Sequence, residues 1–135
     1  MTAAGGRLAT WTMAALGVTA VVAGLVVLGS PADARRQRID EHRVSDLQRL
    51  SSAIDVQWNR TGQLPENAAA IGTPNGPALP RQDPATGAGY EYHVIAAAQY
   101  ELCATFDAAS EDAPGFWSHG PGRMCFTVTP QRVAR

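Results

Sequence analysis

Lysine is absent from this chain, and its eleven arginines are balanced by twelve acidic residues, which leaves a net charge of −1. A near-neutral chain offers no electrostatic basis for binding nucleic acid. The 135 residues also lack the short motifs of serine hydrolases, zinc proteases, phosphate-binding loops and dinucleotide-binding folds. The sequence therefore favours a protein that is not an enzyme, with no cofactor, no nucleic-acid partner and no evident small-molecule substrate.

Histidine and cysteine are scarce as well. The three histidines, His42, His93 and His119, have no nucleophile or carboxylate evidently placed to act with them. Cys103 and Cys125 are the only cysteines, whereas a structural zinc site takes four Cys or His ligands. Because the spacing of these residues matches no zinc motif, we predict no metal centre.

Charge is missing from one long segment, Leu8–Leu28. Its length is that of the roughly 20 apolar residues that span a bilayer, and Trp11 lies near its start, where the membrane interface would be. We predict that residues 1–30 form a single-pass membrane anchor. The alternative is a signal peptide cleaved after Ala34, because Ala32-Asp33-Ala34 fits the signal-peptidase pattern.

The arginines and the cysteines disagree about which side of the membrane holds the rest of the chain. Arg35, Arg36 and Arg38 follow the apolar segment and only Arg7 precedes it, which by the positive-inside rule places the C-terminal part in the cytoplasm. A pair of bonded cysteines instead indicates an oxidising compartment. We favour the extracytoplasmic side.

Residues 31–62 have the pattern of one long amphipathic helix. Ser30-Pro31 provides a cap and a first-turn proline, and Gly62 is a natural end. Most of the charged residues, Asp40, Arg43 and Asp46 among them, lie off the apolar stripe. We expect a projecting stalk at the N-terminal end and a sheet-covering part over 44–62. The apolar stripe consists of Ile39, Val44, Leu47, Leu50, Ile54 and Trp58.

Residues 63–135 are expected to form a loop and an antiparallel sheet, which together with 44–62 make up the globular domain. Asp83-Pro84, followed by glycines, has the chemistry of a tight turn. Apolar and polar residues then alternate with the period of two that indicates strands with one buried face. The expected strands are Tyr90–Ile95, Tyr100–Phe106 and Arg123–Thr129.

The last two strands suggest their own register. If Cys103 lies opposite Cys125, then Leu102 faces Phe126, and the neighbouring inward residues also meet apolar partners. The two sulfur atoms then share the other face of the sheet, close enough for a cross-strand disulfide. Two free thiols in a reducing compartment are the alternative.

The loop between these strands carries the aromatic pair Phe116-Trp117. Exposed aromatic side chains on a loop can anchor a protein partner. The alternative is that both rings fold back into a small core. We regard Phe116 and Trp117 as candidate partner-binding residues on that basis.

Several short motifs resemble those of type IV pilin-like proteins, and most of all the major pseudopilins of type II secretion systems. They are Asp46–Leu50, Asn59–Pro65 with its N-x-x-G-x-L-P pattern, Asp83–Gly87 with D-P-x-T-G, and Tyr90–Tyr92. Tyr100–Phe106 also resembles the C-terminal domain of an uncharacterised group of bacterial membrane proteins. The resemblance implies an α+β fold, with an N-terminal transmembrane helix and a long helix packed on a small three-stranded antiparallel sheet.

The chain also departs from the pilin pattern. Gly5-Gly6-Arg7 is not a prepilin cleavage junction, and Leu8–Leu28 contains no acidic residue. The resemblance therefore implies an interaction or assembly component of a bacterial envelope, fixed in the cytoplasmic membrane, and not a filament subunit. Major pseudopilins bind calcium in a loop near the end of the sheet, and the weak candidates for such a site in this chain are Asp107, Glu111 and Asp112.

Overall fold

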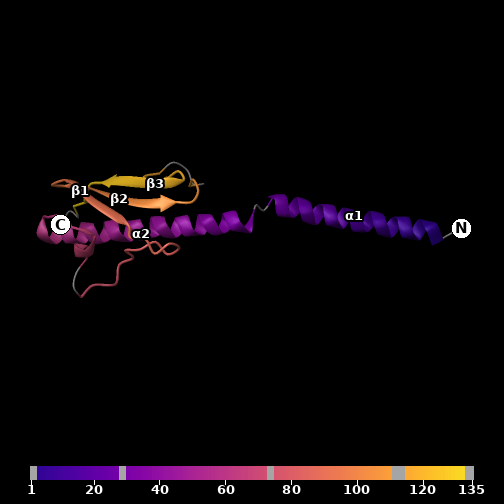
Figure 1. The fold of residues 1–135 in the computed structure, drawn as a ribbon, viewed down its shortest axis with the longest axis horizontal. Helices are drawn as coiled ribbons and strands as arrows, with labels where there is room; N and C mark the ends of the chain where they lie inside the picture. Colours follow the sequence, from indigo (N-terminus) through magenta and orange to yellow (C-terminus); the bar gives the residue numbers. More distant parts are fainter. Residues whose placement is uncertain (1–2, 28–29, 73–74, 111–114, 133–135) are drawn as a thin grey trace. The chain divides into compact units, whose positions relative to one another are not determined.

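The computed structural model describes residues 3–27, 30–72, 75–110 and 115–132. The chain divides into two compact units, Met1–Arg35 and Arg36–Arg135. The class is α+β, with two long helices and one antiparallel sheet of three strands (Figure 1).

Helix α1 covers Ala3–Val27, with no acidic residue in its first turn and no basic residue in its last. Side chains are described for residues 11–24 of this helix, and large apolar ones such as Trp11 and Leu16 are exposed within the chain. Counting only residues whose side chains the structure describes, no helix is both long enough and apolar enough to cross a membrane. The helix expected over Leu8–Leu28 is thus present up to Val27, and its role as a membrane span stays a prediction.

Helix α2 covers Pro31–Thr61. The Ser30 hydroxyl accepts a hydrogen bond from the Ala32 N–H at 3.2 Å, so the predicted cap is in place. Gly62 follows the helix with φ 71°, the left-handed conformation that glycine adopts at a helix end. The sequence therefore predicted both ends of this helix correctly.

The sheet has the order β1-β2-β3, with β1 at Glu91–Ala96, β2 at Gln99–Phe106 and β3 at Gly122–Val128. The two pairs of neighbouring strands are antiparallel. Cys103 lies opposite Cys125 and Leu102 opposite Phe126, as predicted. The register inferred from the alternation and the two cysteines is confirmed.

The core lies between α2 and one face of this sheet. Figure 1 shows the strands lying alongside α2. Alternate residues of β2 point into it, and a short 3-10 helix, η1 at Ala68–Ala70, packs beside it. Strand β1 departs from the expected alternation, because Val94, which shares the face of the chain that carries Tyr90, is 48 % exposed. The fully buried centre consists of Leu47, Leu50, Ile54, Tyr100, Leu102 and Phe106.

Three charged residues of α2 contradict the predicted stripe. Asp40, Arg43 and Asp46 were placed off the buried face, yet each is at most 9 % exposed. The buried face of the helix therefore begins near Asp40, about one turn before Val44, where we expected coverage to begin. The reason is a set of ion pairs with residues far away in the sequence.

Candidate functional site

Arg43 is the centre of a buried charge cluster, defined by Asp40, Arg43, Asp83 and Asp107. Its Nε donates to the Asp83 carboxylate at 2.5 Å, and its Nη1 donates to Asp40 at 2.7 Å and to Asp107 at 2.8 Å. Burial alone would lower the pKa of this guanidinium, but the three carboxylates outweigh that effect and raise it. Arg43 is therefore a permanent cation that joins α2 to two other segments.

The carboxylates of the charge cluster are also held by backbone groups. Asp83 accepts the N–H groups of Ala85 and Thr86 at 2.7 and 2.9 Å, so it shapes the predicted tight turn. Burial raises the pKa of Asp83, but Arg43 and these two N–H groups reverse the shift and lower it. Asp40 in turn accepts the N–H groups of residues 107 and 108 at the end of β2. Every described member of the cluster thus has partners.

The charge cluster includes one of the predicted calcium ligands. Asp107 is the only one of the three candidate calcium ligands that the structure describes, and its carboxylate is bound to Arg43. Glu111 and Asp112 lie outside the described residues. The Arg43 bond gives Asp107 a role in holding the fold together.

A second buried polar contact lies next to the cluster. The Tyr90 hydroxyl donates to Asp46 at 2.9 Å. Burial, followed by this bond to a carboxylate, raises the pKa of Tyr90, so the phenol stays neutral. Tyr90 therefore fixes the chain just before β1 against α2.

A hollow of about 350 Å³ opens between α2 and the loop that precedes β3. Val44 and Gln48 line it from the helix, and Phe116 and Trp117 line it from the loop. Phe116 is 59 % exposed, whereas Trp117 packs on the core residue Phe126 with 4.9 Å between ring centroids. Each of the two alternatives for the aromatic pair therefore holds for one residue. Trp117 packs inward, and Phe116 stays exposed at the surface.

His119 also lines the hollow, from the loop that precedes β3. Its ring stacks on Phe106 at 3.7 Å between centroids, and the residue is 8 % exposed. Its Nδ1 is buried without a hydrogen-bond partner among the described residues. Sequence reasoning missed this burial because a Gly- and Pro-rich loop has no periodicity that would mark an inward residue.

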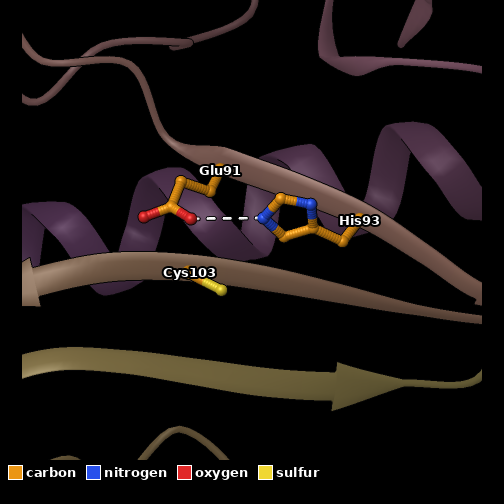
Figure 2. A group of neighbouring side chains, drawn as sticks. All are labelled: Glu91, His93 and Cys103. Carbon is orange, nitrogen blue, oxygen red and sulfur yellow. Dashed lines mark hydrogen bonds and ion pairs between the residues drawn. The ribbon is translucent and has the colours of Figure 1, made fainter.

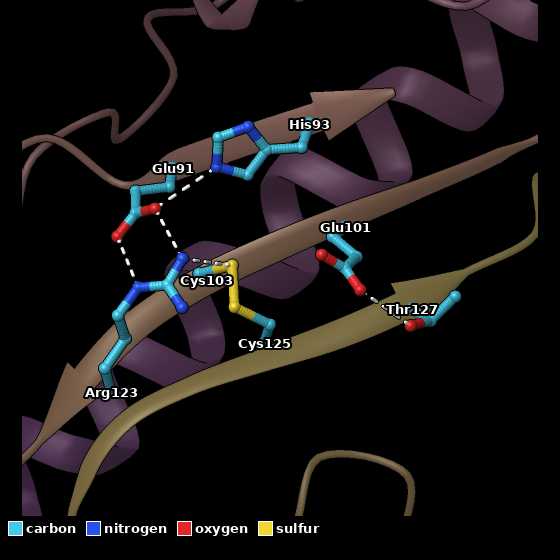
Figure 3. The surroundings of a disulfide bond; sticks show 7 residues. All are labelled: Glu91, His93, Glu101, Cys103, Arg123, Cys125 and Thr127. Carbon is cyan, nitrogen blue, oxygen red and sulfur yellow. Dashed lines mark hydrogen bonds and ion pairs between the residues drawn. A yellow bond between two sulfur atoms is a disulfide. The ribbon is translucent and has the colours of Figure 1, made fainter. Parts of the chain in front are cut away.

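The outer face of the sheet carries the Cys103–Cys125 disulfide (Figure 3). Arg123 covers it, because its Nη2 lies 3.6 Å from the Cys103 sulfur and both its Nε and Nη2 donate to Glu91. The Arg123 bonds, followed by one with His93, lower the pKa of Glu91 to about 2. The disulfide therefore lies beneath a small charged group of residues.

Potential metal ligands gather around this disulfide. Ligand atoms of Glu91, His93 and Cys103 lie within 4.8 Å of one another (Figure 2), as do those of Glu101, Cys103 and Cys125. Both sulfurs are bonded to each other, so neither is available as a thiolate in this state. His93 and Glu101 are paired across β1 and β2.

Comparison with known proteins finds no family model, no curated protein and no solved structure that matches this chain.

Of the predicted site residues, the structure brings the two cysteines together. The two aromatic rings touch each other, with 5.0 Å between centroids, but only Trp117 packs against the core. The structure also adds residues that the sequence did not single out. Arg43 and His119 were missed, and both are buried through contacts with residues distant in the sequence.

Proposed function

We propose that this protein is a non-enzymatic, membrane-anchored component of a bacterial envelope system, with a pilin-like extracytoplasmic domain that binds a protein partner. The apolar segment Leu8–Leu28 is its anchor in the cytoplasmic membrane. The hollow beside Phe116 is the place where the partner binds.

One observation carries the binding role: an aromatic side chain is left exposed at the edge of a preformed hollow. Phe116 is 59 % exposed, and the hollow beside it has a volume of about 350 Å³. Large aromatic side chains that insert into pockets contribute a disproportionate share of binding energy at protein interfaces. Trp117 and Val44 supply apolar walls, and Gln48 supplies a polar edge.

The extracytoplasmic location is supported by the disulfide, because such bonds persist in oxidising compartments and are rare in the cytosol. The anchor is supported by the length and the lack of charge of Leu8–Leu28. The resemblance to major pseudopilins agrees with a long helix on a three-stranded sheet.

A secreted, soluble domain is the alternative, produced by signal peptidase after Ala34. The division of the chain into two compact units after Arg35 favours it, since cleavage after Ala34 would leave the whole of the second unit. The intact mass of the exported protein distinguishes the two, because an anchored protein keeps its N-terminal residues and sediments with membranes.

Site-directed photo-crosslinking tests the binding surface. A photoreactive phenylalanine analogue is placed at position 116 and, as a matched control, at Val56, which is also apolar and 57 % exposed. We expect a discrete crosslinked species in intact cells from position 116 and none from position 56. The same pattern from both positions, or no product from 116, contradicts the proposed site.

A further inference from the structure

The outer face of the sheet arranges side chains in rows that cross the three strands. One row consists of Glu91, Cys103 and Cys125, which are successive partners from β1 to β3. Residues directly opposite in antiparallel strands have Cβ atoms only about 5 Å apart. The next row consists of His93, Glu101 and Thr127. Two residues from each row form a diagonal belt on this face of the sheet (Figure 3): His93, Glu101, Cys103 and Cys125.

The donor atoms of this belt are those that a thiophilic divalent cation prefers. Cys103 lies within 4.8 Å of a His93 nitrogen and, in the second group, within 4.8 Å of Glu101 and Cys125. Two thiolates, one imidazole and one carboxylate make a tetrahedral ligand set of the kind that binds Zn²⁺. In the oxidised protein the sulfurs are bonded to each other, His93 is bonded to Glu91, and the Arg123 guanidinium lies over Cys103, so metal binding requires the disulfide to open and these two side chains to turn away.

We propose that the Cys103–Cys125 disulfide masks a metal site, and that its reduction by a dithiol creates a site for a Zn²⁺-like cation. The ligands are the Sγ atoms of Cys103 and Cys125, an imidazole nitrogen of His93 and the carboxylate of Glu101. The oxidised protein has a structural crosslink at this place and the reduced protein has a metal crosslink. The site is independent of the partner-binding hollow.

The surroundings of the two sulfurs differ, which assigns their roles in the exchange. Cys103 is 1 % exposed, whereas Cys125 is half-buried, so the thiolate of a dithiol attacks the Cys125 sulfur. Cys103 leaves as a thiolate with the electron pair of the S–S bond, and the nearby Arg123 cation stabilises it. The second thiol of the reagent then displaces Cys125. The dithiol is oxidised to its disulfide, and its two protons pass to the cysteine sulfurs or to solvent. Cation binding later displaces any proton that the two sulfurs carry.

The carboxylates next to the sulfurs are not equally free to coordinate. Glu91 is held by two bonds from Arg123 at 2.9 and 2.7 Å. Glu101, in the neighbouring row, is held among the described residues only by the Thr127 hydroxyl at 3.3 Å. Glu101 is therefore the fourth ligand. His93 is 56 % exposed at its side chain, so its ring has room to turn from Glu91 toward the sulfurs.

Cobalt titration of the full chain tests this site, because Co²⁺ bound to thiolates gives an intense near-ultraviolet charge-transfer band. The purified protein is reduced with dithiothreitol, desalted without oxygen and titrated with Co²⁺, with never-reduced protein alongside. We expect saturation at one equivalent in the reduced protein and no band in the oxidised protein. Zn²⁺ should then displace the cobalt and abolish the band.

Single substitutions identify the other ligands. His93→Ala and Glu101→Gln should each weaken Co²⁺ binding by at least about tenfold. His42→Ala, an exposed histidine on α2, is the matched control and should bind as the wild type does. Circular dichroism of each variant in its oxidised form checks that the sheet is intact before reduction.

Three results would overturn the proposal. The first is a reduced protein that gives no thiolate–cobalt band. The second is wild-type affinity in His93→Ala, which would mean that the two cysteines act alone. The third is a reduced protein that unfolds and stays unfolded with Zn²⁺, since the sheet must hold the ligands in place.

Discussion

Replacing Arg43 by methionine would leave the carboxylates of Asp40 and Asp83 buried without their cation. Both side chains are at most 7 % exposed, and each bonds directly to the guanidinium. Removing one partner from a buried ion pair costs about 3–5 kcal/mol. Backbone N–H groups still hold both carboxylates, so we expect the lower end of this range, about 3 kcal/mol.

The assay is thermal unfolding of the purified full chain, followed by circular dichroism. For a domain of about 100 residues, a loss of 3 kcal/mol lowers Tm by about 12 °C or more. Arg49→Met, an exposed arginine on the same helix, is the control and should change the free energy of unfolding by less than about 0.5 kcal/mol. An Arg43→Met protein within about 1 kcal/mol of the wild type would refute the buried charge cluster.

The same variant has a defined pH dependence through Asp83. The pKa of this carboxyl is lowered on folding from its ordinary value of 3.8. The stability that Asp83 contributes is therefore complete above that value and is lost as the pH falls through the lower folded-state pKa. We expect the difference between wild type and Arg43→Met to be constant between about pH 5 and 8 and to shrink below about pH 4. A difference that grows in acid would contradict this.

Urea unfolding of four further variants tests three single features of the fold. Tyr90→Phe removes a hydroxyl that donates to a buried carboxylate and should cost about 2 kcal/mol; no loss would mean that the carboxylate is solvated. Gly87→Ala forces a side chain into φ 72° and should cost about 1–2 kcal/mol, whereas Gly89→Ala, at ordinary φ, should cost less; equal costs would contradict the turn. Replacing Cys103 and Cys125 by serine opens a crosslink across a separation of 22 residues and should cost about 3 kcal/mol, and an unchanged stability would contradict a formed bond.

The register of the sheet could be predicted because alternation has a period of two. Only one pairing of β2 with β3 puts Leu102 opposite Phe126 and both sulfurs on one face, and a slip by one residue would reverse every side chain. The same rule failed at Val94 in β1, where the register shifts between Val94 and Ala96. Alternation predicts which face a side chain takes but not how far the helix covers that face.

The charge cluster could not be predicted from local pattern. Periodicity assigns charged helix residues to solvent, which is the usual outcome. Arg43 is buried only because Asp83 and Asp107 meet it from 40 and 64 residues away. No local signal in the sequence pairs these residues, although the turn at Asp83 was itself correctly predicted.

The candidate site was predicted in part. Aromatic residues on a loop suggested a contact surface, but the sequence could not say which ring faces the core. Packing on Phe126 decided this for Trp117 and left Phe116 at the edge of the hollow. The ligands of the proposed metal site were not predicted because His93, Glu101 and Cys125 come near Cys103 only when the three strands are placed side by side.

Thiol alkylation in intact cells, followed by membrane fractionation and mass measurement, tests the central claim most directly. The account predicts that never-reduced protein sediments with membranes and takes up no alkyl group, whereas reduction before labelling adds one group at Cys103 and one at Cys125. Two alkyl groups in never-reduced protein would contradict a domain held by a disulfide outside the cytoplasm.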